Sequence, residues 1–256
     1  IVKGNLKLKS NLSSDQYRKT VQTALSYIRE GDIYQVNLAQ RFSTGALPHG
    51  RGVHPFELYR SLRRRSPSSF SSYLDAKDFQ IISSSPERFL SKQGRLLQTR
   101  PMKGTRPRGK NILQDKKERR NLLLSAKDKA ELLMITDLER NDLGRVCEYG
   151  SVKVKNMRTI EAYRSVFQAT STVEGIVRKG MDAFDVLQAC FPGGSITGCP
   201  KIRSMQIIEE LEPHHRGIYT GALGYISFNG DMDFNILIRT LLKIKNEIYF
   251  HVGGGI

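Results

Sequence analysis

Several residues that often define a protein's class are scarce in this sequence. The 256 residues include no tryptophan and only three cysteines, Cys147, Cys190 and Cys199. The cysteines form no C-x-x-C pair and have no histidines at zinc-finger spacing, so we expect reduced, packed thiols in a cytoplasmic protein. No apolar run approaches the roughly 18 residues of a membrane-spanning helix. Neither end resembles a targeting peptide, and we expect a globular protein with no membrane segment.

Acidic residues are also scarce, with 25 Asp and Glu against 41 Lys and Arg and a formal net charge of +16. This imbalance favours an anionic partner, either nucleic acid or a small polyanion. The basic run Arg63–Arg65 has no interleaved stacking residues, and no RNP-type aromatic motif is present. The sequence therefore indicates no dedicated nucleic-acid site, although a basic nucleic-acid-binding module stays open as an alternative.

The two ends of the sequence indicate an excerpt of a longer protein. The chain begins with Ile1 and stops at Gly253-Gly254-Gly255-Ile256. A glycine run normally leads the chain into a following element, so we expect truncation at both ends.

Hydrophobic patterning predicts one α+β domain over residues 1–256. Ser13 and Gln16 have capping-box spacing at the start of an amphipathic helix that Gly31 ends. Residues 33–42 alternate as a strand whose one face carries Gln35 and Asn37. Further helices are predicted at 55–65, 114–141, 181–191 and 200–212. Further strands are predicted at 70–74, 79–83, 89–97 (a hairpin), 152–159 and 165–173, and residues 222–252 are predicted to form a meander.

Lys103 is a candidate nucleophile in an otherwise basic segment. It lies between Pro101 and Gly104 in a predicted loop, residues 100–120, that is dense in Lys and Arg. Neighbouring positive charges lower the pKa of an amine and so favour its nucleophilic form. A solvated basic loop explains the same pattern.

Three carboxylates are candidates for acid–base or metal chemistry. Glu87 follows a hydroxyl-rich strand end and would act as a general acid if burial raised its pKa; an ion pair with Arg88 is the plainer reading. Asp128 and Glu131 lie three residues apart on one helical face, where two carboxylates suit Mg²⁺. Such pairs are also common on solvated helices.

Two glycine-rich segments are candidate anion sites. Residues 191–201 place Ser195, Thr197 and Gly198 directly before a predicted helix, where hydroxyls and free N–H groups hold anions. The segment lacks a nucleotide P-loop pattern. Gly253–Gly255 would form either a backbone nest for an anion or a plain tight turn.

Taken together, these segments resemble the chorismate-utilising enzymes, most closely the branch that forms aminodeoxychorismate. The resemblance runs from the first helix to the last residue, and its motifs are Tyr34–Phe42, Ser85–Phe89, Gln98–Thr105, Asp137–Arg145, Phe191–Lys201 and Gly253–Ile256. It implies a two-lobed α/β sandwich of two packed antiparallel sheets with helices outside and a chorismate site between the sheets.

The resemblance assigns roles to the acid and the amine. Glu87 is similar to the general acid that protonates the leaving C4 hydroxyl of chorismate. Lys103 is similar to the lysine that attacks ring C2 before ammonia enters at C4. Anthranilate synthases usually have alanine there. Gln35 occupies the place of the water-activating lysine of the isochorismate and salicylate branches, which argues against both.

The remaining assignments concern the metal and the substrate. Glu131, with Asp128 beside it, is expected to hold Mg²⁺, and a second metal glutamate is expected beyond Ile256. Gln168 stands where many members have histidine. The residues expected to contact the substrate are Gln35, Gln168, Ser195, Thr197, Gly198, Tyr219, Arg239, Gly253 and Gly255.

The expected activity is therefore Mg²⁺-dependent amination of chorismate at C4 to 4-amino-4-deoxychorismate, on the route to 4-aminobenzoate and folate. No cysteine lies in a nucleophile-elbow pattern, so ammonia is expected from a separate glutamine amidotransferase subunit, in a heterodimer. Anthranilate synthase component I is the alternative enzyme activity.

Overall fold

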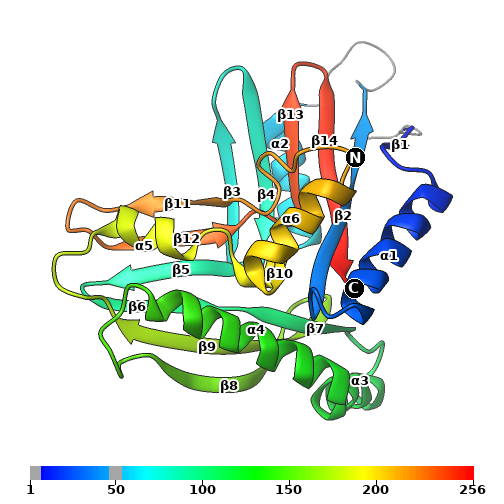
Figure 1. Cartoon of the computed structure of the whole chain (residues 1–256). Helices are drawn as coiled ribbons and strands as arrows, with labels where there is room; N and C mark the ends of the chain where they lie inside the picture. The colour runs from blue at the N-terminus through cyan, green and yellow to red at the C-terminus, as the bar shows by residue number, and fades with distance from the viewer. Residues whose placement is uncertain (1–6, 46–53) are drawn as a thin grey trace. The chain divides into compact units, whose positions relative to one another are not determined.

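The computed structural model describes residues 7–45 and 54–256, which form two compact units. Unit 1 comprises Ile1–Pro86, Thr197–Gly221 and Leu237–Ile256, and unit 2 comprises Glu87–Ile196 and Ala222–Ile236. Each unit contains one antiparallel sheet with helices packed against it (Figure 1). This architecture confirms the expected α+β class. The assignment of residues 1–256 to a single domain stays a prediction.

The sheet of unit 1 has the strand order β1-β2-β14-β13-β4-β3, and β10 also pairs with β2. Its strands are β1 (Lys9–Ser10), β2 (Gln35–Thr44), β3 (Phe70–Asp75), β4 (Phe79–Ser85), β10 (Gly198–Cys199), β13 (Thr240–Ile244) and β14 (Glu247–Gly255). Its helices are α1 (Ser14–Arg29), α2 (Pro55–Arg65) and α6 (Lys201–Leu211).

The sheet of unit 2 has the order β11-β12-β5-β6-β9-β7, with β8 also paired to β9. Its strands are β5 (Arg88–Gln93), β6 (Leu96–Arg100), β7 (Met102–Pro107), β8 (Lys153–Ala162), β9 (Val166–Ile176), β11 (Ala222–Ile226) and β12 (Met232–Ile236). Its helices are α3 (Ile112–Leu124), α4 (Ala126–Gly144), α5 (Ala183–Cys190) and the 3-10 turn η1 (Gly194–Ile196).

Helix α1 begins where the capping box predicts. The Ser13 hydroxyl accepts a hydrogen bond from the Gln16 N–H, and the Gln16 side chain accepts one from the Ser13 N–H. These bonds satisfy donors that a helix N-terminus leaves without partners. Ala24 of α1, Leu38 of β2 and Ile207 of α6 are fully buried in one cluster, which fixes α1 and α6 against β2.

The segment predicted as a basic loop is instead a strand followed by a helix. Met102–Pro107 forms β7, antiparallel to β9, and α3 starts at Ile112. The predicted helix over 114–141 is also two helices, because Ser125 is extended between them and caps α4 through its hydroxyl. Sequence periodicity missed this break because Leu122 of α3 and Leu132 of α4 pack in the same core cluster.

The C-terminal segment is not one meander. β12 belongs to the sheet of unit 2 and β13 to the sheet of unit 1, so the meander predicted over 222–252 is divided between two sheets. Arg239 lies between these two strands with a φ of 51°. The alternation of apolar and polar residues shows only that one face of a strand is buried. It is the same whichever sheet the strand joins, so the sequence did not reveal the change of sheet.

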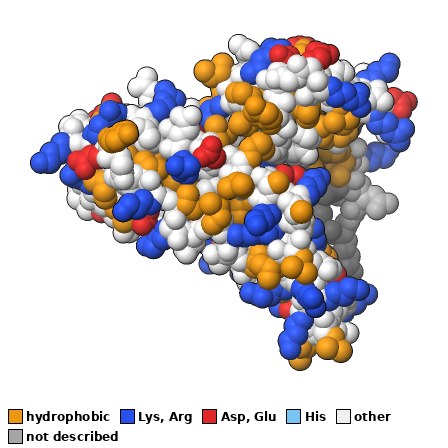
Figure 2. Space-filling model, turned by 60° about the horizontal axis from the view of Figure 1, so that its bottom comes forward, with side chains coloured by type: hydrophobic (Ala, Val, Ile, Leu, Met, Phe, Trp, Pro, Cys, Tyr) orange, Lys and Arg blue, Asp and Glu red, His pale blue; other side chains and the backbone are white. Residues whose placement is uncertain are grey.

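Basic side chains are distributed broadly over the surface. Figure 2 shows Lys and Arg scattered over the visible face, with few Asp and Glu, among patches of hydrophobic side chains. None of the helices in the described part of the chain has the length and apolar character needed to span a membrane.

Candidate active site

Unit 2 brings the predicted acid and the predicted amine together. Glu87 immediately precedes β5 and is only 4% exposed. Its Oε1 accepts a hydrogen bond of 3.2 Å from the N–H of Met102, the first residue of β7. Lys103 is the next residue of that strand, so the hydrogen bond ties the carboxyl to the strand that carries the amine, and the charge of Glu87 acts on that amine.

The lowered pKa of Lys103 has a different cause from the one its sequence suggested. Burial is the largest effect and lowers the pKa, because an apolar surrounding penalises the charged ammonium. The charges nearest to it are carboxylates, Glu87 and Glu131, and both raise the pKa in part. The three side chains therefore interact within one unit, as the expected chemistry requires.

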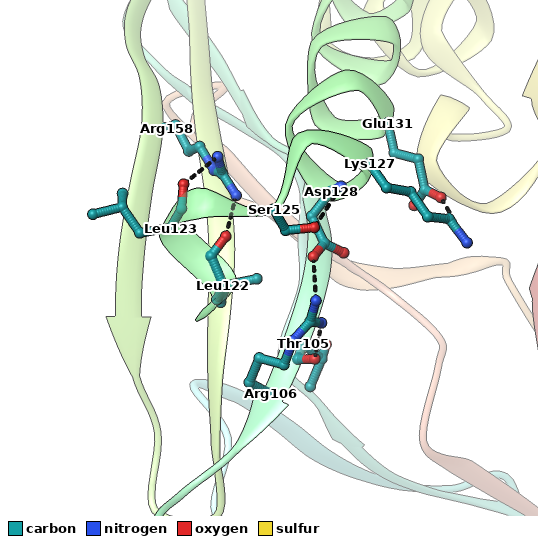
Figure 3. Close-up of polar contacts among 9 residues, drawn as sticks. All are labelled: Thr105, Arg106, Leu122, Leu123, Ser125, Lys127, Asp128, Glu131 and Arg158. Atoms are coloured by element: carbon teal, nitrogen blue, oxygen red, sulfur yellow. Dashed lines mark hydrogen bonds and ion pairs between the residues drawn. The ribbon is translucent and has the colours of Figure 1, made fainter. Parts of the chain in front are cut away.

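The two carboxylates predicted as metal ligands have different partners. Figure 3 shows Asp128 directed toward Arg106 and Glu131 directed toward Lys127. The Asp128–Arg106 ion pair is 2.7 Å long and mostly shielded from solvent, whereas the Lys127–Glu131 pair is 3.7 Å long with Lys127 largely exposed. Exposed pairs of this kind are weak. Glu131 is thus the more available carboxylate, and Asp128 serves as the partner of Arg106.

The described residues supply part of a Mg²⁺ site. A carboxylate oxygen such as that of Glu131 is the donor type that Mg²⁺ prefers. Over residues 7–45 and 54–256, however, no three His, Cys, Asp or Glu side chains form a group that could hold a metal ion. The donors therefore fit in type but are too few to form a complete protein site, and Mg²⁺ usually keeps waters and substrate oxygens as its other ligands.

Glu139, to which the sequence assigned no role, holds the glycine loop of unit 2. It is 2% exposed and accepts hydrogen bonds from the Gly194 N–H at 3.0 Å and from the Thr99 hydroxyl at 3.3 Å. One backbone N–H of the predicted anion-binding loop, that of Gly194, is thus already bonded to a carboxylate of the protein. Ser195 follows in the same turn and is buried. Glu139 belongs to the motif Asp137–Arg145, so the sequence contained a signal that could have pointed to it.

Gln168 carries a buried acceptor that the described residues leave unsatisfied. It is 5% exposed, and its Oε1 has no hydrogen-bond partner in the described part of the chain. On β9 it is paired with Thr105 of β7 and Glu161 of β8. Because an unsatisfied buried amide is costly, its oxygen is a candidate for contact with a ligand.

In unit 1, the glycines of β14 form an extended edge and no nest or turn. Val36 and Ile256 exchange both backbone hydrogen bonds, so the alternation of an antiparallel ladder makes the pairs Gly255–Asn37 and Gly253–Ala39 the non-hydrogen-bonded ones. The peptide groups of both glycines point away from β2. On that side β13 pairs only as far as Phe250, which leaves these N–H groups available to a carboxylate.

Gln35 lies against this glycine edge. A Cβ on Gly255 would come within 2.3 Å of the Gln35 Nε2, so any residue other than glycine would force the Gln35 amide to move. Gln35 is 5% exposed, and neither atom of its amide has a partner among the described residues. The amide face predicted for this strand therefore meets the predicted carboxylate site.

Thr197 and Gly198 support β2 from its other side. The Thr197 carbonyl accepts the Asn37 N–H at 2.8 Å. Gly198 has a φ of 151°, and a Cβ on it would lie 2.2 Å from the Gln35 carbonyl oxygen. We therefore interpret Gly198 as a structural glycine that lets the two backbones come close at Gln35. Thr197 is buried, and its hydroxyl is the remaining candidate for an anion contact.

Tyr219 and Arg239 both lie in irregular segments of unit 1. Tyr219 stacks on His251 with ring centroids 4.7 Å apart and lines a cavity of about 270 Å³. Burial raises the pKa of the Tyr219 phenol, so it stays protonated as a hydrogen-bond donor. The left-handed φ of Arg239 is costly for a residue with a side chain, and such strain often accompanies function.

The predicted site residues thus fall into two groups, each assembled within its own unit. Unit 2 contains Glu87, Lys103, Asp128, Glu131, Gln168 and Ser195, whereas unit 1 contains Gln35, Thr197, Gly198, Tyr219, Arg239, Gly253 and Gly255. The shared substrate site that would join the two groups stays a prediction.

An α+β chain of two antiparallel sheets with these polar groups matches one family along nearly its full length. The family model for chorismate binding enzymes matches residues 2–256, so this chain belongs to that family. The chain spans about half the length of the curated relatives it matches.

Relatives from two branches are similar to the chain. The aminodeoxychorismate synthase component 1 of Bacillus subtilis is 46% identical over 244 residues, which cover 95% of this chain and 51% of that protein. The anthranilate synthase component 1 of Thermus thermophilus is 44% identical over 253 residues, covering 99% of this chain and 54% of that protein.

Solved structures agree with the fold. The anthranilate synthase component I of Streptococcus pneumoniae has a TM-score of 0.88 and 39% identity, covering 98% of this chain and 55% of that chain. MenF of Escherichia coli, a menaquinone-specific isochorismate synthase, has a TM-score of 0.84 at 19% identity, covering 100% of this chain and 59% of that chain. The latter shows the fold alone.

Proposed function

We propose that this chain carries the catalytic residues of an enzyme that aminates chorismate at C4 to give 4-amino-4-deoxychorismate. The observation that carries the proposal is the cluster of Glu87, Lys103 and Glu131 in unit 2. A half-buried lysine whose pKa is lowered by burial is a nucleophile, and a buried carboxyl beside it can serve as an acid. The similarity to aminodeoxychorismate synthases supports this branch.

The reaction is a double displacement on the ring. The neutral amine of Lys103 forms a bond to C2, the two conjugated ring double bonds shift from C1=C2 and C5=C6 to C1=C6 and C4=C5, and the C4–O bond breaks as Glu87 protonates the hydroxyl, which leaves as water. Ammonia then bonds to C4, both double bonds shift back, and the C2–N bond breaks to release Lys103. The proton lost by the new ammonium group restores Glu87. The sum consumes chorismate and ammonia and yields the amine and water.

The residues of unit 1 bind the substrate carboxylates. The N–H groups of Gly253 and Gly255 donate to a carboxylate, and the Arg239 guanidinium suits a bidentate contact. The Tyr219 hydroxyl and the Gln35 amide add neutral donors. In unit 2, the side chains of Gln168 and Ser195 donate hydrogen bonds to the substrate or accept them from it.

We propose that Glu131 holds a Mg²⁺ ion, with Asp128 close by. When bound, the ion would neutralise a substrate carboxylate and orient the ring. Ammonia would come from a separate glutamine amidotransferase subunit. The three cysteines of the chain form no disulfide in the structure, which fits a reducing cytoplasm.

The test is incubation of the full-length protein with chorismate, Mg²⁺ and ammonia. We expect a product that a 4-aminobenzoate-forming lyase converts to 4-aminobenzoate, and a covalent adduct on Lys103 in the mass spectrum. The variant Lys103→Ala should lose the adduct. Lys92→Ala, which removes another well-buried lysine of unit 2, is the matched control and should keep it.

Three results would contradict the proposal at different points. Fluorescent anthranilate formed without the lyase would move the protein to the anthranilate branch, which its 44% identity to a Thermus thermophilus anthranilate synthase keeps as the second candidate. An adduct that persists in Lys103→Ala would remove Lys103 from the mechanism. Salt-resistant binding to RNA without any chorismate turnover would instead favour the nucleic-acid-binding alternative.

A further inference from the structure

A buried ion pair lies directly behind the glycine edge of unit 1. Glu212 caps the C-terminus of α6, and Arg216 follows four residues later, beyond the end of the helix. The pair is bidentate: Arg216 Nε donates to Glu212 Oε2 at 3.0 Å and Nη2 donates to Oε1 at 2.7 Å. The side chains are only 13% and 6% exposed, respectively. Neither the sequence motifs nor the proposed mechanism gives this pair a role.

Both members of the pair also bind the backbone of β2. Glu212 Oε1 accepts the Ala39 N–H at 2.8 Å, and Arg216 Nη2 donates to the Asn37 carbonyl at 2.7 Å. Ala39 and Asn37 are the register partners of Gly253 and Gly255. In such non-hydrogen-bonded pairs, the N–H and carbonyl groups of Ala39 and Asn37 point away from β14. The ion pair supplies hydrogen-bond partners for the Ala39 N–H and the Asn37 carbonyl on that side.

The same arginine reaches the loop that carries Tyr219. Its guanidinium carbon lies 5.7 Å from the centroid of the Tyr219 ring, and Nη1 donates to the Thr220 hydroxyl at 3.4 Å. Thr220 has a φ of 62°, an unfavourable conformation that surrounding contacts must hold. One ion pair therefore fixes both the backbone behind the glycine edge and the turn next to Tyr219.

Stability alone is a poor reason for such a pair. Removing two charges from water costs several kcal/mol per ion, and well-packed apolar residues often replace a buried pair with no loss of stability. A rigid bidentate pair with additional backbone bonds is better suited to fixing a geometry. A displacement of about 1 Å far from the reacting atoms can cost about 100-fold, and for groups that only bind the substrate this loss appears in the KM.

We propose that Glu212 and Arg216 are positioning residues for carboxylate binding, acting through the Gly253–Gly255 edge and Tyr219. This inference rests on the proposed function of that site. The donors and acceptors of the pair are engaged by the protein, so the pair sets where the binding groups stand and leaves the reacting atoms of unit 2 unchanged.

The test is Arg216→Lys in the full-length protein, assayed with chorismate and ammonia. An ammonium group cannot make the bidentate contact together with the bonds to the Asn37 carbonyl and the Thr220 hydroxyl in this geometry. We expect the KM for chorismate to rise about 10- to 100-fold while kcat changes less than about threefold, the pattern of lost ground-state binding. Glu212→Gln keeps an acceptor for Ala39 and should raise KM less, in the same direction.

The control is an ion pair that involves α6 itself. Arg203 binds Asp32 at 3.0 Å and is more exposed than Arg216, so Arg203→Lys makes the same substitution at an ion pair that does not bind the backbone behind the glycine edge. We expect its KM to stay near the wild-type value.

The outcomes separate this inference from the proposed function. If the wild-type protein does not turn over chorismate, the proposed function fails. If the wild type is active and Arg216→Lys is folded with an unchanged KM, or loses kcat instead, the positioning role is overturned. Should Arg216→Lys fail to fold, Glu212→Gln decides, and failure of both to fold would assign the pair to stability and overturn the inference.

Discussion

Lys103 and His251 both have a pKa lowered by burial, but the charges around them differ in sign. Carboxylates next to Lys103 partly restore the charged form, whereas Arg41 and Arg216 add to the effect of burial on His251. The Lys103 amine can therefore still gain and lose a proton, whereas the His251 imidazole is held in its neutral form. These two residues give predictions that need no substrate.

The amine of Lys103 should be more reactive at low pH than an ordinary lysine. Burial lowers the pKa of Lys103. In a titration from low to high pH, this amine therefore loses its proton before an ordinary lysine does. We expect acetylation of Lys103 by a fast reagent, followed by mass spectrometry, to reach its half-maximum below the midpoint of Nα-acetyl-lysine amide in the same tube, about 10.4. An equal or higher midpoint would contradict a desolvated amine.

His251 should make folding stability depend on acid. Its pKa is lowered from 6.5 to about 4, so the unfolded chain binds a proton that the folded protein excludes. Its contribution is fully present above pH 6.5 and is lost as the pH falls toward 4. We expect His251→Gln to flatten the fall in urea-unfolding free energy over this interval. The exposed His54→Gln is the control, and a wild-type slope in His251→Gln would refute the assignment.

At the scale of elements, β14 provides a matched pair of glycines. A methyl group on Gly255 would meet the Gln35 amide, whereas nothing lies within 4 Å of a Cβ on Gly254. We expect Gly255→Ala to destabilise unit 1 by about 1–3 kcal/mol, the usual cost of overpacking, and to raise the KM for chorismate. Gly254→Ala should do neither. Equal effects on urea unfolding would show that the Gln35 contact is unimportant.

The break between α3 and α4 makes Ser125 a second testable element. Its hydroxyl accepts the Asp128 N–H at 3.2 Å and so begins the helix that carries Glu131. Ser125→Ala should cost about 1 kcal/mol in unfolding free energy, as loss of an N-cap does, and Ser125→Asn should keep most of the stability. If alanine were neutral in urea unfolding, α3 and α4 would behave as the single helix that the periodicity suggested.

For the whole molecule, the dominant physical property is the net charge of +16. The basic side chains are spread over the face shown in Figure 2, so on that face they act through a long-range field more than through one patch. Such a field attracts a dianion such as chorismate, and salt weakens it because the Debye length falls to about 10 Å at 0.1 M.

Salt should therefore raise the KM for chorismate. Between about 0.01 M and 0.3 M KCl we expect an increase of a few fold, from the loss of long-range attraction. The KM for ammonia, measured in the same assay, is the internal control because neutral ammonia is insensitive to the field. A chorismate KM that does not change with salt would separate the net charge from substrate binding.

Some of these features follow from the sequence because they depend on neighbours along the chain. The Ser13 capping box, the bounds of α2 and the hairpin predicted over 89–97 are local features, and the structure contains all three. The family resemblance, confirmed by the family match, identified Glu87, Lys103 and Glu131 as a group. Spacing alone identified none of these roles.

Tertiary structure decided what depends on distant segments. The sequence alone determined which residues carry charge, which begin helices and which motifs are present. Only the fold decided that Lys103 is surrounded by carboxylates, that β12 and β13 belong to different sheets, and that Asp128 is taken by Arg106. The reason is physical: burial and the local electric field at a side chain are set by residues far away in sequence, and no local pattern records them.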